Sequence, residues 1–159
     1  MLNKKCKVSA LGGTFSFFHK GHQFLLINAL KSSKELLIGI TSDEFVRKLG
    51  KQHPVEPYEV RALNVLHFCL NNMSKNQRVT VFPLDDPYGP TIERADIDCI
   101  IVSEETFKRA SEINELREKK GLKRLNIIKV ELVRDEKGEK ISSTVLWRRS
   151  SLVSPYKIR

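Results

Sequence analysis

Long hydrophobic runs are missing from this sequence, and their absence argues against two classes of protein. No apolar run approaches the roughly 20 residues that a membrane-spanning helix needs, and the N-terminal stretch MLNKKCKVSALGG lacks the sustained apolar core of a secretory signal. Long tracts of proline, serine or glutamine are also missing, as is typical of globular proteins. We expect one domain over residues 1–159, with a C-terminal tail from about residue 150, in a cytoplasmic protein without membrane partners.

Cysteine is scarce, and its spacing matches no common metal or redox motif. The three cysteines, Cys6, Cys69 and Cys99, are odd in number and form no C-x-x-C pair. Cys6 and Cys99 lie within apolar runs, where a free cysteine packs as a small hydrophobic residue. We therefore predict buried free thiols.

Acidic residues are outnumbered by basic ones, which gives a formal net charge of +9. This excess fits either a nucleic acid or a small anionic substrate as the partner. Much of it lies in ELREKKGLKR and WRRSSLVSPYKIR, which have the character of a solvated helix face and a basic tail. The small anionic substrate is therefore the favoured interpretation, and we do not expect nucleic acid to be the partner.

Apolar runs rich in β-branched residues alternate with segments of helical periodicity. Helical spacing covers residues 24–30, 60–70 and 107–116, and we expect a last helix to start at KISSTVLWRR after a surface turn at VRDEKGEK. This alternation predicts an α/β fold with a doubly wound, five-stranded parallel sheet, similar to a Rossmann fold. The predicted strands cover residues 6–11, 35–41, 79–84, 97–103 and 125–132.

Folds of this class bind ligands at the carboxyl ends of the strands, where the strand order reverses. The loops expected there are GGTFSFFHKGH, TSDEFVRKLGK, DDPYGPT and SEET. In the first, we expect Gly12 and Gly13 to turn the backbone sharply and a helix to resume near Gly21, whose free N–H groups would favour a phosphate oxygen. His19 and His22 can both point toward that anion, so we predict a phosphate site.

The loop GGTFSFFHKGH could in principle serve other kinds of site. The sequence contains neither the G-x-G-x-x-G dinucleotide fingerprint after the first strand nor a P-loop. A zinc site on His19 and His22 would need two further ligands, which Cys6 and Cys69 do not obviously supply, so we predict no metal site on the protein. A histidine here could also simply cap the helix, although the pair beside GGT favours the phosphate site.

These residues resemble a known family. GGTFSFFHKGH is similar to the T/H-x-G-H signature of the nucleotidyltransferase superfamily, and the order of the later motifs resembles the archaeal and eukaryotic type of phosphopantetheine adenylyltransferase, over nearly residues 7–149. The resemblance implies a coenzyme A biosynthesis enzyme that uses ATP, 4'-phosphopantetheine and Mg²⁺ and releases dephospho-coenzyme A and pyrophosphate. The later motifs are TSDEFVRKLGK, PYEVRALNV, DDPYGPT, IIVSEET, INELREKKGL and ISST.

The resemblance also implies roles for residues of the first motif. Thr14 would lie where the attacking phosphate meets the α-phosphate of ATP, with the backbone of Gly13 and Phe15 close by. His19 would be the main donor to the transition state, and His22 would bind a phosphate of ATP.

On the acceptor side, the resemblance assigns a phosphate-clamping lysine to Lys48 or Lys51. Arg61 would position the phosphopantetheine arm, with a solvated arginine at an ordinary helix start as the alternative. Asp86 and Tyr88 would shape the pocket wall, with a rigid proline turn as the alternative explanation of DDPYGPT.

On the nucleotide side, Asn114 and Arg117 match positions that the family keeps, although a solvated helix face explains Arg117 equally well. The hydroxyl and N–H groups of ISST would hold the triphosphate at another helix start. The residues concerned are Ser142, Ser143 and Thr144.

Two positions depart from the family pattern. Ser16 stands where the superfamily often has an aspartate, which elsewhere could anchor the loop or magnesium. Trp147 stands at the usual arginine of I-S-S-T-x-x-R, and we expect Arg148 to take over that contact with phosphate. A related enzyme with another acceptor (nicotinamide mononucleotide, flavin mononucleotide or glycerol phosphate) and a non-catalytic nucleotide- or RNA-binding relative remain the alternatives; the oligomeric state is not predicted.

Overall fold

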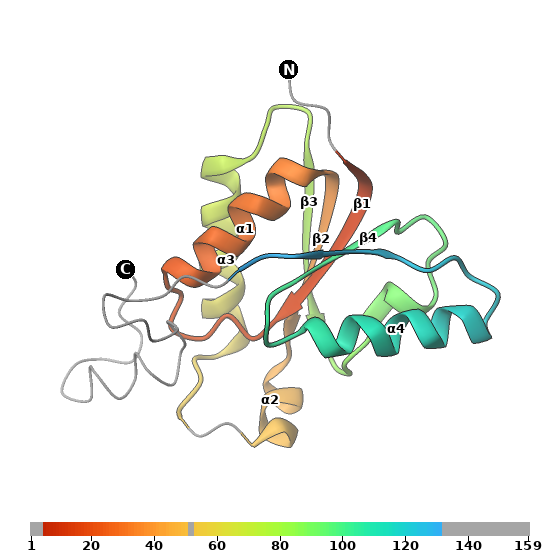
Figure 1. The fold of residues 1–159 in the computed structure, drawn as a ribbon. Helices are drawn as coiled ribbons and strands as arrows, with labels where there is room; N and C mark the ends of the chain where they lie inside the picture. The colour runs from red at the N-terminus through yellow and green to blue at the C-terminus, as the bar shows by residue number, and fades with distance from the viewer. Residues whose placement is uncertain (1–4, 51–52, 132–159) are drawn as a thin grey trace.

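The computed structural model describes residues 5–50 and 53–131, and five parallel strands form its centre (Figure 1). Their order is β3-β2-β1-β4-β5, so the sheet grows from β1 in one direction and β4 then returns to the other side of β1. The doubly wound parallel fold is thereby confirmed, with each strand close to its expected position. The strands are β1 (Cys6–Gly13), β2 (Ser33–Thr41), β3 (Arg78–Leu84), β4 (Cys99–Val102) and β5 (Asn126–Lys129).

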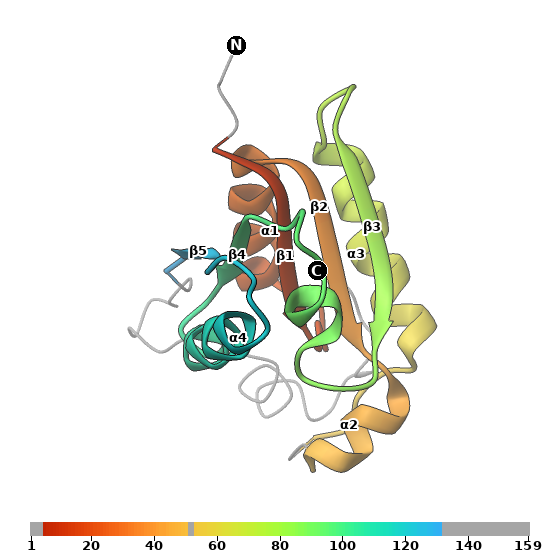
Figure 2. The ribbon, with the colours of Figure 1, turned by 90° about the vertical axis from the view of Figure 1, so that its right-hand side faces the viewer.

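Helices cover both faces of the sheet, with α1 and α3 on one side and α4 on the other (Figure 2). The three helices expected from periodicity are present, but α2 and a short 3-10 turn, η1, were not predicted. Residues that typically begin and end a helix do flank α2 in the sequence. The Ser42 hydroxyl accepts a hydrogen bond from the Phe45 N–H group as the N-cap, and Gly50 ends the helix with φ 62°. The bounds are α1 (Lys20–Ser32), α2 (Asp43–Leu49), α3 (Tyr58–Asn72), η1 (Gly89–Ile92) and α4 (Phe107–Lys119).

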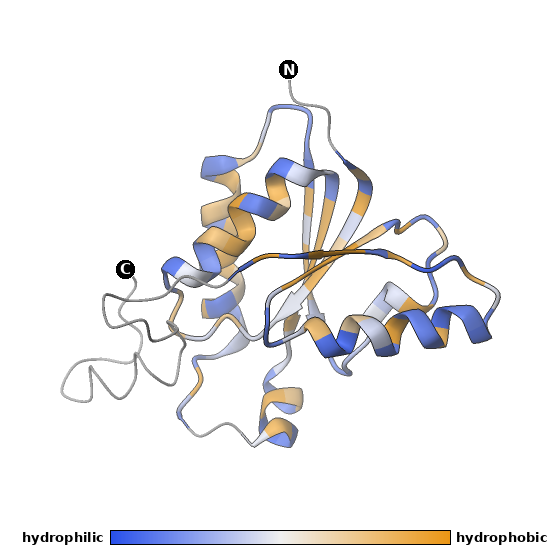
Figure 3. Ribbon diagram, viewed as in Figure 1, coloured by the Kyte–Doolittle hydropathy of each residue, from blue (hydrophilic) through white to orange (hydrophobic). Residues whose placement is uncertain are grey.

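Two apolar clusters pack against the two faces of the sheet. Successive residues of β2 alternate between them, since Leu36 and Ile38 pack under α1 and α3 whereas Leu37 packs under α4. Figure 3 shows hydrophobic residues along the central strands and hydrophilic ones toward the C-terminal end of α4. None of the described helices is long and apolar enough to cross a membrane.

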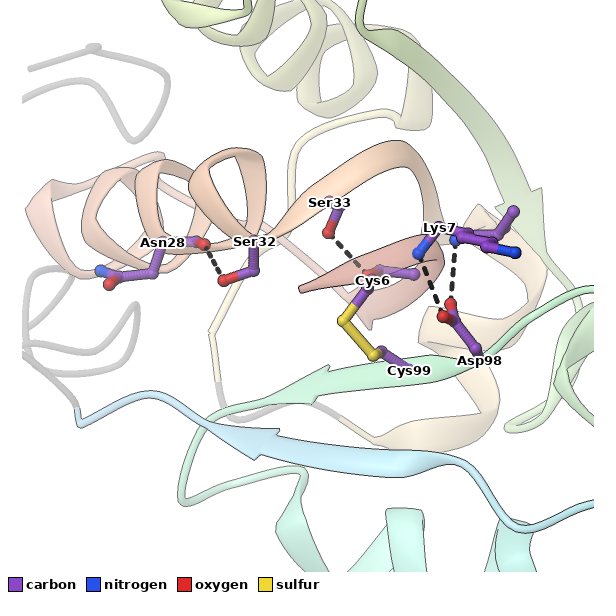
Figure 4. The surroundings of a disulfide bond; sticks show 9 residues. Cys6, Lys7, Asn28, Ser32, Ser33, Asp98 and Cys99 are labelled. Atoms are coloured by element: carbon purple, nitrogen blue, oxygen red, sulfur yellow. Dashed lines mark hydrogen bonds between the residues drawn. A yellow bond between two sulfur atoms is a disulfide. The ribbon is translucent and has the colours of Figure 1, made fainter. Parts of the chain in front are cut away.

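A disulfide joins the first residues of β1 and β4, Cys6 and Cys99, which lie 93 positions apart in the sequence (Figure 4). Both side chains are fully buried. Next to the bond, the Asp98 carboxylate accepts hydrogen bonds from the backbone N–H group of Lys7, at 3.0 Å, and from that of the following residue. The prediction of free thiols is wrong for this pair, because β1 and β4 become neighbours only in the folded sheet; Cys69 is buried and free, as predicted.

Candidate active site

A pocket of about 420 Å³ opens at the carboxyl ends of β1 and β4, where the strand order reverses. The loop after β1 contributes Thr14, and the start of α1 contributes His19 and His22. The loop after β3 adds Tyr88, and the segment leading into α4 adds Thr106. The pocket therefore lies at the reversal point predicted for a doubly wound sheet, and the loops expected there do meet around it.

The sharp turn after β1 is made by phenylalanines and not by glycines. Gly12 and Gly13 still belong to β1, whereas Phe15 and Phe17 adopt positive φ angles of 57° and 48°. The expected glycine turn is therefore wrong. Close packing restricts these two positions, because a Cβ at Gly13 would lie 3.1 Å from the Phe15 ring and one at Gly12 3.3 Å from Leu84, and the neighbouring side chain would have to shift.

His19 and His22 cap the start of α1 reciprocally. His19 Nδ1 accepts hydrogen bonds from the N–H groups of Gly21 at 3.0 Å and His22 at 3.4 Å, and His22 Nδ1 accepts from the N–H group of His19 at 3.2 Å. Two helix-start N–H groups that phosphate was expected to bind are thus already occupied. Because each Nδ1 accepts, the neutral ring carries its proton on Nε2, and each imidazole is a hydrogen-bond donor at that atom.

Both histidines are uncharged near pH 7. Burial lowers the pKa of His19 from its ordinary value of 6.5 to about 4. Burial, and secondly the charge of His19, lowers the pKa of His22 well below its ordinary value. The rings stack with their centroids 3.7 Å apart, so that a charge on one opposes a charge on the other. The pair therefore offers neutral N–H donors, which gain a charge only if an anion stabilises it.

Arg61 holds the backbone beside Thr14 in place. Its guanidinium is fully buried, and its Nη1 donates to the carbonyl oxygens of Thr14 at 3.0 Å and Thr41 at 2.8 Å. Its Nη2 pairs with the Asp43 carboxylate at 2.9 Å. The solvated-arginine alternative is therefore wrong. Arg61 does not line the pocket, so its expected contact with the phosphopantetheine arm stays a prediction.

Of the two lysines expected to clamp phosphate, the structure describes only Lys48, which does not line the pocket. The side chain of Lys48 is 69% exposed and lies 4.0 Å from the Glu44 carboxylate, while Phe45 and Leu49 of the same helix do line the pocket. Lys51 lies outside the described residues. Neither assignment is tested by this arrangement.

The loop after β3 is organised by Asp86. Its carboxylate accepts hydrogen bonds from the N–H groups of Tyr88 and Gly89, each at 2.8 Å, which fixes the turn into η1. Tyr88 lines the pocket, whereas Asp86 does not. A turn-forming role therefore accounts for Asp86, and its expected role in shaping the pocket wall around the substrate remains a prediction.

Comparison with known proteins identifies the family. The cytidylyltransferase-like family model matches residues 10–149. A phosphopantetheine adenylyltransferase of Methanopyrus kandleri is 46% identical over 136 residues, covering 86% of this chain and 85% of that protein. One of Pyrococcus furiosus is 35% identical, covering 98% of this chain and 94% of that protein. This chain belongs to the phosphopantetheine adenylyltransferases of the cytidylyltransferase-like family. It is thus a nucleotidyltransferase, as the sequence motifs indicate.

Solved structures share the fold of this phosphopantetheine adenylyltransferase family member. An Archaeoglobus fulgidus protein of unknown function superposes with a TM-score of 0.70 at 33% identity, covering 86% of this chain and 99% of the other. A bifunctional NMN adenylyltransferase/ADP ribose pyrophosphatase of Francisella tularensis superposes with a TM-score of 0.57 at 17% identity, covering 96% of this chain and 44% of the other. A similarity at this level of identity shows the fold alone.

Two residues expected to contact nucleotide are engaged elsewhere in this adenylyltransferase. The Asn114 side chain bonds to both the N–H group and the carbonyl oxygen of Leu125. Arg117 is 1% exposed and donates to backbone carbonyl oxygens, including that of Thr91 at 2.7 Å. Burial excludes the solvated-helix alternative for Arg117. Neither residue lines the pocket, and the contact with nucleotide remains a prediction for both.

Three residues of this adenylyltransferase site were missed by sequence reasoning. Arg109, on the first turn of α4, lines the pocket. In the sequence it could not be distinguished from the other charged residues of a helix rich in exposed lysine and glutamate. His53 lines the pocket too, and its Nδ1 lies 2.8 Å from the Pro54 carbonyl oxygen. A carbonyl oxygen only accepts, so His53 Nδ1 carries a proton and donates it to this hydrogen bond. Glu56, fully buried behind the first loop, carried no sequence signal.

The remaining site assignments for this family member lie outside the described residues, as do the last predicted helix and the preceding surface turn. The residues concerned are Ser142, Ser143, Thr144 and Arg148.

Proposed function

We propose that this chain transfers the adenylyl group of ATP to 4'-phosphopantetheine, giving dephospho-coenzyme A and pyrophosphate. The observation that carries the proposal is the joint placement of Thr14, His19 and His22 at one pocket on the switch point of the sheet. The relatives that share 35–46% of their residues with this chain bear the name of this activity. The pocket chemistry supports transfer of a nucleotidyl group between phosphates, and the names of the relatives favour 4'-phosphopantetheine over nicotinamide mononucleotide, flavin mononucleotide or glycerol phosphate as the acceptor.

The reaction does not require the protein to remove a proton from the attacking group. A phosphate monoester is already anionic at neutral pH, so its oxygen can attack the α-phosphorus of ATP without a general base. The new P–O bond forms as the bond to the pyrophosphate oxygen breaks, and pyrophosphate leaves with the bonding electrons. The site must therefore align the two phosphates and stabilise the charge that develops on the equatorial oxygens.

The described residues fit these two tasks. Thr14, on the turn that separates β1 from α1, lines the pocket and would lie between the two phosphates. The Nε2–H groups of His19 and His22 would donate to phosphate oxygens, and His19 would stabilise the transition state. We further propose that Arg109 binds nucleotide phosphate, since it brings a cationic side chain to the pocket. Lys48 would complete the clamp on the acceptor phosphate after a change of side-chain conformation.

Magnesium fits this site as a companion of the nucleotide. No group of three or more His, Cys, Asp or Glu side chains suitable for a metal occurs among residues 5–50 and 53–131. Mg²⁺ is commonly held by substrate phosphates with only one or two protein carboxylates, and Glu105 lines the pocket. When bound with ATP, the ion would neutralise part of the triphosphate charge.

The test is a pyrophosphate-release assay with ATP, Mg²⁺ and a panel of acceptors. Turnover with 4'-phosphopantetheine, but not with nicotinamide mononucleotide, flavin mononucleotide or glycerol phosphate, is the expected result. Turnover with one of the other acceptors alone would assign the enzyme to that reaction. No pyrophosphate from any acceptor, together with measurable ATP binding, would favour the non-catalytic relative.

A further inference from the structure

The turn between β1 and α1 is held in a conformation that it would not adopt unaided. Phe15 and Phe17 both lie in the left-handed region of φ, which is unfavourable for a residue that carries a side chain. Their rings are buried, with Phe15 3% and Phe17 8% exposed. Between them, Ser16 is 2% exposed. Such a conformation persists only where surrounding groups fix it, so the contacts of this turn are informative.

Glu56 supplies two of those contacts with one carboxylate. Its Oε1 accepts a hydrogen bond from the Ser16 hydroxyl at 2.9 Å, and its Oε2 accepts from the Phe17 N–H group at 2.8 Å. Glu56 is 2% exposed and lies just before α3, 40 positions after Ser16. Hydrogen bonds to a charged acceptor are roughly twice as strong as neutral ones. Glu56 therefore acts as a buried brace across the turn.

Residues 56–61 contact the turn at a second point, through the side chain of Arg61. Arg61 Nε donates to the backbone carbonyl oxygen of Glu56 at 2.8 Å, and Arg61 Nη1 donates to that of Thr14 at 3.0 Å. The turn is thus fixed at Thr14 on one side and at Ser16 and Phe17 on the other, from a single anchor at the start of α3. Immediately beyond it lies His19, the N-cap of α1.

We propose that Glu56 is a positioning residue for adenylyl transfer, fixing through Ser16 and Phe17 the turn that sets Thr14 and His19 against the two phosphates. The inference rests on the proposed function. It also gives a physical account of Ser16, which stands where the superfamily often has an aspartate. Here the buried carboxylate comes from the opposite side of the turn, and a serine hydroxyl is the donor that it needs.

The first test compares Glu56→Ala with Glu56→Gln. Loss of the carboxylate should lower kcat about tenfold to a hundredfold, because small misplacements of reacting groups have effects of that size, while both KM values change less than about threefold. Glu56→Gln keeps the shape and an acceptor for Phe17 and should recover most of kcat. The exposed Glu59, three positions along, gives the matched control Glu59→Ala, which should keep the wild-type kcat.

A second pair of variants tests the hydrogen bonds of Glu56 while keeping a polar side chain at both position 16 and position 56. Ser16→Asp places a second carboxylate against that of Glu56, and the like charges should disrupt the turn and lower kcat. Adding Glu56→Gln should then restore kcat, because one carboxylate is again paired with a neutral partner. A Ser16→Asp variant as active as the wild type, or a double variant no better than Ser16→Asp, would overturn the brace.

Amide hydrogen exchange tests whether Glu56 holds the turn without any enzyme assay, so that this result does not depend on which phosphate acceptor the enzyme uses. The Phe17 amide should exchange at least about tenfold faster in Glu56→Ala than in the wild type or in Glu59→Ala, since its hydrogen bond is removed. Unchanged exchange would overturn the brace, and faster exchange with unchanged kcat would overturn its positioning role. If the wild type releases no pyrophosphate with 4'-phosphopantetheine, the proposed function fails, while the exchange rates still decide whether Glu56 holds the turn.

Discussion

Arg61 Nη1 lies 3.0 Å from the carbonyl oxygen of Thr14, although 47 positions separate the two residues. The guanidinium has no exposed surface and also bonds to the Thr41 carbonyl oxygen and the Asp43 carboxylate. One side chain therefore joins the ends of β1 and β2 to the start of α3. Because Thr14 lines the pocket and Arg61 does not, the arginine acts on the site through the backbone.

Arg61→Lys should weaken both the fold and the site. A lysine ammonium cannot reproduce the planar fork, which leaves buried carbonyl oxygens without a donor and costs about 1–3 kcal/mol. We expect a lower urea midpoint and a reduced kcat. Arg124→Lys is the control, because Arg124 and Glu118 form an exposed pair whose loss should change stability by less than about 0.5 kcal/mol. Equal midpoints for the two variants would contradict the role given to Arg61.

Substitutions of His19 should separate its capping role from its role toward phosphate. Asparagine can accept the N-cap hydrogen bonds that His19 Nδ1 now accepts, whereas alanine cannot, so His19→Ala should lose about 1 kcal/mol of stability and His19→Asn little. Both variants lack the Nε2–H donor, and both should lose about a hundredfold to a thousandfold in kcat. Urea unfolding and pyrophosphate release measure the two effects, and near-wild-type turnover in His19→Asn would refute the donor role.

Burial of His19 should also make the protein less stable in mild acid. The folded-state pKa of about 4 lies below the ordinary 6.5, so between these values the unfolded chain binds a proton that the folded chain rejects. Stability should therefore fall as the pH drops from 6.5 toward 4, by at most about 3 kcal/mol from this residue. His22 contributes in the same direction.

Urea unfolding at pH 7.5, 6.0 and 5.0 would measure this dependence. His19→Asn removes the titrating ring while keeping the cap, so its midpoint should fall less steeply with pH than that of the wild type. Identical slopes for the two proteins would show that His19 does not titrate as its burial implies.

Local patterns in the sequence predicted the architecture and the place of the pocket. The five strands were recognisable because buried parallel strands are near-continuous apolar runs such as DCIIVS. The pocket followed from topology alone, since the reversal of strand order fixes where the loops meet. Thr14, His19 and His22 were found because their motif lies within one short loop.

The contacts that hold this loop could not be predicted in the same way. Glu56 and Arg61 act on residues 40 and 47 positions away, and a glutamate and an arginine near a helix start are most often solvated. The turn itself was assigned to glycines by their intrinsic freedom, whereas packing against Leu84 and Phe15 is what restricts those positions. Long-range packing decided each of these details.

The disulfide leads to the last prediction, which concerns stability alone. Cys6 and Cys99 are the first residues of β1 and β4, whereas the pocket lies at the carboxyl ends of those strands. A cross-link that closes a loop of this length stabilises by about 4 kcal/mol through the unfolded chain. The urea midpoint should therefore fall markedly in reductant. The kcat measured under native conditions should stay the same, since the two Asp98 hydrogen bonds keep the strands aligned.

Two variants serve as controls. In the double variant Cys6→Ser/Cys99→Ser, reductant should not change the urea midpoint, whereas in Cys69→Ala reductant should lower the midpoint as it does in the wild type. A thiol count of three in the unfolded, unreduced wild type, in place of the expected one, would show that the bond does not form.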